Sequence, residues 1–117
     1  LLVNNKLDLL SGENVVEVIK YILSRNPLCI SFNCISPNIF EKLFTILKLN
    51  FNWGMYLNLG SGSYNSKKIV THFSPIEYSQ IVSKYLIKQP SFVGGCCGSN
   101  PNQIKKLRQV LDGKLNN

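Results

Sequence analysis

The chain has 117 residues, of which 44% are hydrophobic and 16% are charged. This composition is typical of one folded unit with a hydrophobic core, and it excludes a disordered, highly charged segment. No apolar run approaches the length of about 18 residues that a membrane-spanning helix needs, so we expect no membrane partner. Leu1 does not open a secretory leader, and we expect the chain to be the interior of a longer protein.

The net charge of +7 arises from 13 Lys and Arg residues against 6 Asp and Glu residues. Such an excess can favour nucleic acid or an acidic membrane surface. The basic residues are scattered and form no continuous block, so we expect them to lie on solvated helix faces and expect no nucleic-acid partner. The 4 cysteines are too few for a disulfide-dense secreted scaffold, which favours reduced thiols and a cytoplasmic location.

Apolar periodicity and capping signals predict helices that alternate with strands. The predicted helices cover about 13–25, 37–47, 75–88 and 101–112. The predicted strands cover 28–32, 53–57 and 91–95. The expected capping residues at the helix starts are Ser11, Ser36, Ser74 and Asn100. A helix between successive strands implies parallel pairing, so the predicted fold class is α/β with the order α-β-α-β-α-β-α.

Two further segments carry specific expectations. The polar, glycine-rich segment 58–66 is long for a connection inside a domain, which more often indicates a functional loop than filler. The last helix is expected to stop at Gly113. Its predicted buried side chains are Ile104, Leu107, Val110 and Leu111.

Two adjacent cysteines, Cys96 and Cys97, stand in a glycine frame formed by Gly94, Gly95 and Gly98. On a regular strand neighbouring side chains point to opposite faces, so these two sulfurs could not both bind one ion there. Glycine permits a positive φ or a tightly curled backbone. We therefore expect the three glycines to shape the backbone so that both sulfurs turn the same way.

A third thiol, Cys34, stands where another predicted strand meets a helix start. Three thiolates at the ends of two strands would make a soft-metal site with one coordination position left for a substrate. The alternative is that these cysteines are small core hydrophobes and that the vicinal pair is merely redox-active. Cys29 precedes Cys34 on the same predicted strand at about 16 Å, so we expect it to be a core side chain outside the site.

Several ordered segments carry a resemblance to a known family. They are Asn33-Cys34-Ile35-Ser36-Pro37, Tyr56-Leu57-Asn58, Phe73-Ser74-Pro75-Ile76-Glu77-Tyr78 and the run from Gly94 to Ile104. These segments resemble the C-terminal part of the homocysteine S-methyltransferase domain. That family includes betaine–homocysteine methyltransferase, S-methylmethionine-dependent enzymes and the homocysteine module of cobalamin-dependent methionine synthase. Ser99-Asn100 stands where the family usually has Thr-Thr or Thr-Ser, but Asn100 can still cap the helix.

The resemblance implies a (β/α)8 TIM barrel in which Cys34, Cys96 and Cys97 hold zinc. It also implies zinc-dependent methyl transfer to the thiol of homocysteine, giving methionine. The implied methyl donor is S-methylmethionine, betaine or methylcobalamin/methyltetrahydrofolate. A complete barrel has about 250 residues and eight strands. Residues 1–117 are therefore expected to be a partial homocysteine-binding domain that holds about three strands, lacks the N-terminal part of the barrel and is inactive alone.

Other polar and aromatic residues have two open interpretations each. Asn33 and Asn58 are candidate substrate contacts, and simple loop polarity is an equal alternative. Tyr56 could line the pocket or simply pack against its neighbours. His72, the single histidine, is expected to be an exposed bystander. Two rival functions remain: a structural zinc module, for which His72 would be the fourth ligand, and a non-catalytic, degenerate paralogue of the same fold.

Overall fold

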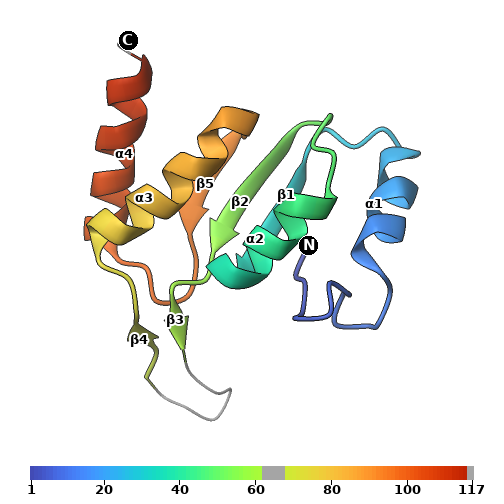
Figure 1. Ribbon diagram of the computed structural model, residues 1–117, viewed down its shortest axis with the longest axis horizontal. Helices are drawn as coiled ribbons and strands as arrows, with labels where there is room; N and C mark the ends of the chain where they lie inside the picture. Colours follow the sequence, from blue (N-terminus) through green and yellow to red (C-terminus); the bar gives the residue numbers. More distant parts are fainter. Residues whose placement is uncertain (62–67, 116–117) are drawn as a thin grey trace.

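A parallel sheet of three strands forms the centre of the computed structural model, which describes residues 1–61 and 68–115. The strands lie in the order β1-β2-β5 and comprise Ile30–Ile35, Trp53–Leu57 and Phe92–Gly95 (Figure 1). The helices are α1 (Val15–Leu23), α2 (Pro37–Ile46), α3 (Pro75–Tyr85) and α4 (Pro101–Leu115), and a 3-10 turn, η1 (Leu86–Lys88), follows α3. The predicted α/β class with parallel strands is confirmed.

Local capping explains where most helices begin. The hydroxyl of Ser36 accepts a hydrogen bond from the backbone of α2, and Ser74 forms a complete capping box with Glu77 at the start of α3. At the start of α4, Asn100 accepts from a first-turn amide while the side chain of Gln103 accepts from the Asn100 amide at 3.0 Å. Each pair satisfies amides that a helix start would otherwise leave unpaired.

The predicted start of the first helix is wrong. Its N-cap is Asn14, whose side-chain oxygen accepts from the Val16 amide at 3.1 Å, whereas the Ser11 hydroxyl donates to the Glu13 carboxylate instead. Asn14 caps the helix because an N-cap residue must lie next to the first turn, and Asn14 is nearer to it than Ser11. The predicted strand 28–32 is also displaced, since β1 begins at Ile30 and continues to Ile35.

The C-terminal helix differs from its prediction in two ways. It continues through Gly113 to its last described turn, so the predicted stop at this glycine is wrong. Ile104 is 43% exposed rather than buried, and Gln103 is buried in its place. The Gln103 amide donates to the Phe73 carbonyl at 3.0 Å, so this polar side chain can be buried without leaving its nitrogen unpaired.

The helices cover one face of the sheet. Alternate strand residues on that face are buried, including Phe32 on β1 and Trp53 on β2. Phe40 of α2 lies 5.9 Å from the Trp53 ring and 4.9 Å from the Tyr85 ring of α3, measured between ring centroids. These aromatic contacts join two helices to the sheet, and each adds about 0.5–1.5 kcal/mol beyond burial.

Among the described residues, no helix covers the opposite face of the sheet (Figure 1). Its aromatic side chains are Tyr56 of β2 and Phe92 of β5, whose ring centroids lie 5.4 Å apart. Each ring covers a glycine on the neighbouring strand: a Cβ on Gly94 would lie 2.5 Å from the Tyr56 ring, and one on Gly54 would lie 2.2 Å from the Phe92 ring. Tyr56 is nevertheless 39% exposed, so this face is only partly shielded.

A small antiparallel ribbon extends from the carboxyl end of the sheet. It consists of β3 (Gly60–Ser61) and β4 (Val70–Thr71) (Figure 1). Residues 62–66 of the predicted functional loop lie outside the described residues. The described residues at the start of that loop belong to a hairpin: Gly60 pairs with Thr71, and the His72 amide donates to the Leu59 carbonyl at 2.9 Å.

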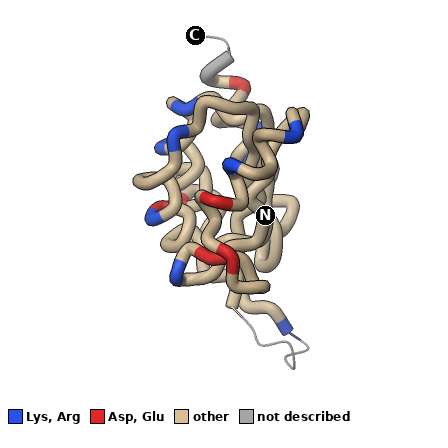
Figure 2. The backbone as a smooth tube through the Cα atoms, turned by 90° about the vertical axis from the view of Figure 1, so that its right-hand side faces the viewer, with Lys and Arg blue, Asp and Glu red and all other residues tan. Residues whose placement is uncertain are grey.

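The charged residues match the scattered pattern of the sequence. Figure 2 shows Lys and Arg spread along the described chain, with Asp and Glu among them. The described helices include none with both the length and the hydropathy needed to cross a membrane.

Tyr78 fastens α3 to β5 through a buried hydrogen bond. Its hydroxyl donates to the Gly94 carbonyl, and burial raises the pKa of this phenol well above its ordinary value of 10.0, so it stays a donor even in alkaline solution. Replacing Tyr78 with phenylalanine should lower the free energy of unfolding by about 1–3 kcal/mol, because it removes the partner of a buried carbonyl. Urea titration measures this loss.

A matched control is Tyr21→Phe, because Tyr21 is 62% exposed and its hydroxyl accepts a hydrogen bond from the exposed Arg25 side chain. That change should alter the free energy of unfolding by less than about 0.5 kcal/mol. Equal losses in both variants would contradict a specific role for the Tyr78 hydroxyl.

Candidate metal centre

A β-bulge directs Cys34 out of its strand. In the pairing of β1 with β2, Asn33 lies opposite Tyr56 and Ile35 lies opposite Leu57, so Cys34 is an extra residue. Its φ of 56° lies in the left-handed region, which costs about 1–3 kcal/mol for a residue with a side chain. The bulge returns Ile35 to the core and turns the Cys34 side chain to the carboxyl edge of the sheet.

A tight turn positions the vicinal cysteines. The Ser99 amide donates to the Cys96 carbonyl at 3.1 Å, and Gly98 between them has a φ of 77°. A four-residue turn with a positive φ at its third position has the pattern of a type II turn, which favours glycine there. The Cys96 amide continues the pairing with β2 by donating to the Leu57 carbonyl at 2.9 Å. Cys96 thus ends the strand and Cys97 begins the turn.

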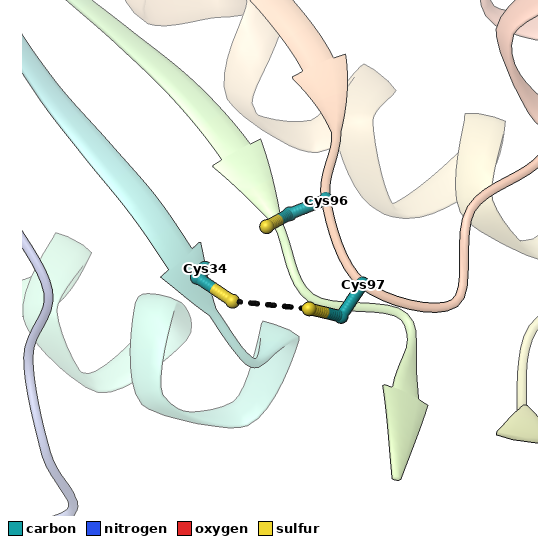
Figure 3. Close-up of side chains that lie close together, drawn as sticks. All are labelled: Cys34, Cys96 and Cys97. Atoms are coloured by element: carbon teal, nitrogen blue, oxygen red, sulfur yellow. Dashed lines mark hydrogen bonds between the residues drawn. The ribbon is translucent and has the colours of Figure 1, made fainter. Parts of the chain in front are cut away.

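The three sulfurs meet at the carboxyl ends of β1 and β5. Figure 3 shows the side chains of Cys34, Cys96 and Cys97 pointing toward one another. All three sulfur atoms lie within 4.8 Å of one another, and the Cys34 thiol lies 3.6 Å from the Cys97 sulfur. Thiolates bound tetrahedrally at about 2.3 Å from one ion would stand about 3.8 Å apart. The arrangement therefore fits a soft cation with only small movements.

The surroundings of Cys34 favour its protonated thiol when no cation is bound. Burial raises the pKa of Cys34 from its ordinary value of 9.0 to about 12, and the hydrogen bonds and negative charges of Cys96 and Cys97 act in the same direction. A cation between the sulfurs would reverse this repulsion, because metal binding favours the deprotonated thiolate.

Metal affinity at this cluster should rise steeply with pH. The raised pKa means that the folded, metal-free protein holds the Cys34 proton more tightly than an exposed thiol would, so protons compete with the metal more strongly as the pH falls. Between about pH 6 and 8, binding of one zinc ion should release about three protons. Isothermal titration calorimetry in buffers of different ionisation enthalpy counts them.

The matching control for proton release is Cys97→Ser. It should bind zinc much more weakly, and the zinc that it takes up at high metal concentration should release about two protons, one for each thiol left in the cluster. The same number of released protons in this variant and in the unchanged protein would show that Cys97 is not a ligand.

The predicted polar residues occupy different positions relative to the cluster. Asn58 contacts it directly: its side-chain amide donates to the Cys34 sulfur at 3.6 Å, and its side-chain oxygen accepts from the Gly60 amide at 3.0 Å. Asn33 is exposed and accepts a hydrogen bond from the Ser31 hydroxyl. Asn58 is thus held where it can stabilise a thiolate, whereas Asn33 bonds to Ser31 instead.

Tyr56 lies on the uncovered face of the sheet, with its ring against Gly94 near the point where β5 leads into the cysteine turn. It therefore packs against its neighbours and also stays partly exposed, and its place in a substrate pocket stays a prediction.

The glycine frame works differently from the prediction. Gly98 has a positive φ, whereas Gly94 and Gly95 lie in β5 without one, so only Gly98 uses the positive-φ alternative. Gly94 and Gly95 instead permit close packing: a Cβ on Gly95 would lie 2.5 Å from the Cβ of Ser99. A Cβ on Gly98 would lie 2.5 Å from the backbone of Gly60, which shows how tightly the turn packs on the hairpin.

Cys29 and His72 lie apart from the cluster. Cys29 precedes β1 and is half-buried, and its sulfur contacts the Ile30 carbonyl. The exposed His72 ring contacts the Ser61 hydroxyl across the hairpin. Among the described residues, no further His, Cys, Asp or Glu joins the three sulfurs. A structural zinc site closed by His72 therefore has no support in this geometry.

Sequence reasoning missed the role of the β3–β4 ribbon beside the site. The Thr71 hydroxyl donates to the Gly98 carbonyl at 2.7 Å, and the Leu59 amide donates to the Cys97 carbonyl at 2.7 Å. These contacts tie the cysteine turn to the hairpin and to the residue before it. Two sequence signals could have indicated a hairpin. They are the closely spaced glycines at 60 and 62 and the β-branched residues Val70 and Thr71.

A parallel α/β sheet with three converging thiols at the carboxyl ends of its strands defines the class: an α/β protein with a candidate thiolate metal centre where such folds hold their active sites. A model of the family described as homocysteine S-methyltransferase matches residues 1–111. The chain is 30% identical over 106 residues to homocysteine S-methyltransferase 3 of Arabidopsis thaliana. This chain therefore belongs to the homocysteine S-methyltransferase family, as its motifs predicted.

The alignment with the Arabidopsis protein covers 86% of this chain but only 30% of the relative. The chain thus corresponds to less than half of a protein of that length, and the activity of the whole protein is a matter of proposal.

Proposed function

We propose that the protein containing this chain transfers a methyl group to the thiol of homocysteine and so forms methionine, as a step of methionine biosynthesis. Cys34, Cys96 and Cys97 would hold a zinc ion at its site. The observation that carries this proposal is the convergence of the three sulfurs within 4.8 Å in a chain of this family. The name of the Arabidopsis relative supports homocysteine as the methyl acceptor.

The donor set suits zinc better than a hard cation. Zinc readily takes thiolate ligands, and three protein ligands leave a fourth position for a substrate. When bound, zinc would let a substrate thiol lose its proton at neutral pH. The three protein thiolates would keep the centre electron-rich, which favours transfer of a methyl group to a neighbouring sulfur.

The surrounding side chains would orient the cluster rather than react. Asn58 holds the Cys34 sulfur through its amide, and that hydrogen bond would stabilise the thiolate form. We propose that Tyr56 and Asn33, on the uncovered face of the sheet, line the substrate pocket beside the cluster. Gly98 fixes the turn that presents Cys97.

We further propose that residues 1–117 form part of a (β/α)8 barrel whose N-terminal strands come from the rest of the protein. The uncovered face with Tyr56 and Phe92 would then be the barrel interior. Leu1 already bonds to the outer edge of β1: the Asn33 amide donates to its carbonyl at 2.8 Å, and its amino group donates to the Ser31 carbonyl. This is the hydrogen-bond pattern of a parallel neighbour, and it supports strand pairing at that edge.

The methyl donor would bind mainly through parts of the protein outside this chain. S-methylmethionine, betaine and methylcobalamin/methyltetrahydrofolate are the proposed candidates. Four unpaired cysteines are consistent with the proposed cytoplasmic location, where thiols stay reduced. We propose that this chain alone is inactive, because a barrel active site needs loops from strands that the chain does not supply.

The test is a methionine-formation assay on the full-length protein, with homocysteine and each donor supplied separately, together with metal analysis of the same preparation. The proposal requires zinc close to one equivalent per protein and methionine formation with at least one donor. A full-length protein that binds zinc but forms no methionine with any of them would support the degenerate paralogue instead.

A further inference from the structure

The cysteine cluster offers three sulfur donors, which is the number needed by an ion that binds three sulfurs and no fourth ligand. Its sulfurs come from two strands, so the backbone brings them together before any ion binds. All three cysteines are half-buried, so none of them is fully closed off from solvent. No other acidic, thiol or imidazole group among the described residues competes for a place in the cluster.

We propose that Cys34, Cys96 and Cys97 form a capture site for trivalent arsenic, presented as arsenite. Trivalent arsenic is thiophilic and forms a three-sided pyramid of bonds, with its lone pair in the remaining direction. The inference rests on the same sulfur cluster as the proposed function, but it does not require methyl transfer.

The binding step balances without an oxidant or a reductant. Arsenous acid, As(OH)3, exchanges its three As–O bonds for three As–S bonds. Each thiol proton leaves on the departing hydroxide, so three water molecules are released and arsenic stays in its trivalent state. The product is electrically neutral, so a partly buried site does not have to stabilise a net charge.

Geometry distinguishes this site from an ordinary vicinal pair. Cys96 and Cys97 alone could supply only two sulfurs, whereas Cys34 stands 3.6 Å from the Cys97 sulfur and completes the pyramid. The bulge at Cys34 and the turn at Gly98 hold these sulfurs in place, so little chain ordering opposes binding. The third sulfur acts at a high effective concentration, which should strengthen capture by about 100-fold over two thiols.

The test uses the full-length protein, freed of divalent metal by a chelator and reduced with a phosphine, and sodium arsenite as the probe. Alkylation followed by peptide mass mapping then measures the protection of each cysteine. We expect Cys34, Cys96 and Cys97 to be protected together at one equivalent of arsenite, while Cys29 is alkylated as it is without arsenite. Alkylation of all four, or protection of Cys96 and Cys97 alone, would overturn the proposal.

Two cluster variants and one control variant test the same inference, so the result does not depend on any one substitution. Cys34→Ser and Cys97→Ser should each weaken arsenite binding by about 100-fold, and Cys29→Ser should leave it unchanged. Wild-type affinity in both cluster variants would refute a three-sulfur site. Circular dichroism checks that each variant is folded. Normal methionine formation without arsenite capture would reject this inference alone, whereas capture without methionine formation would reject only the proposed enzymatic function.

Discussion

Replacing Cys96 with serine in the full-length protein should remove bound zinc and lower the rate of methionine formation by about a thousandfold or more. A catalytic metal contributes several kcal/mol of transition-state stabilisation, and each 1.36 kcal/mol corresponds to about tenfold in rate. Serine keeps the size of the side chain but replaces the soft sulfur with a hydroxyl, a poor zinc ligand. Metal analysis and the methionine assay on one preparation measure both effects.

The matched control is Cys29→Ser, because Cys29 is a half-buried cysteine whose sulfur lies outside the cluster. It should retain full zinc content and activity. Normal activity in the Cys96 variant would dismiss its assigned role. Thermal unfolding followed by circular dichroism separates loss of the metal from loss of the fold.

Replacing Gly98 with alanine should destabilise the protein and weaken metal binding together. The added Cβ would lie 2.5 Å from the backbone of Gly60, and the residue would have to keep a φ of 77°. A left-handed backbone costs a residue with a side chain about 1–2 kcal/mol, and overpacking adds about 1–3 kcal/mol. The turn can relieve the clash only by moving, and this displaces Cys97 from Cys34. Urea titration and competition with a zinc chelator measure the two losses.

Gly113→Ala is the control for this prediction, because a Cβ at Gly113 would meet nothing within 4 Å. Gly113 lies inside α4, where alanine is favoured over glycine by about 1 kcal/mol, so this change should stabilise the protein slightly and leave zinc affinity unchanged. If Gly98→Ala behaved in the same way, the tight approach of the turn to the hairpin would not be needed for the site.

Signals that act within one helical turn were readable from the sequence. Ser74 and Glu77 predict the capping box that the structure contains, and Ser36 and Asn100 cap the helices that they were expected to begin. The prediction that Ser11 caps the first helix was wrong, because Asn14 lies closer to the first turn and competes for the same amides. The predicted stop at Gly113 was wrong. The weak helix propensity of one glycine was not enough to end α4, which continues past it.

Features that depend on pairing between distant segments could not be predicted from the sequence. The bulge at Cys34 exists only relative to β2, because it is the register with Tyr56 and Leu57 that makes this cysteine an extra residue. The β3–β4 ribbon depends on its contact with the cysteine turn, where Gly60 meets Gly98. Neither contact leaves a local pattern in the chain.

The sequence by itself determined the family, the alternation of helices with parallel strands and the three candidate ligand thiols, because motifs, caps and hydrophobic periodicity are local properties. Only the tertiary structure decided how the thiols converge. A left-handed backbone at Cys34 redirects one sulfur, a turn at Gly98 presents another, and Asn58 donates a hydrogen bond to the first. These arrangements arise from packing between strands and hairpin, and that packing is set by contacts between residues far apart in the chain.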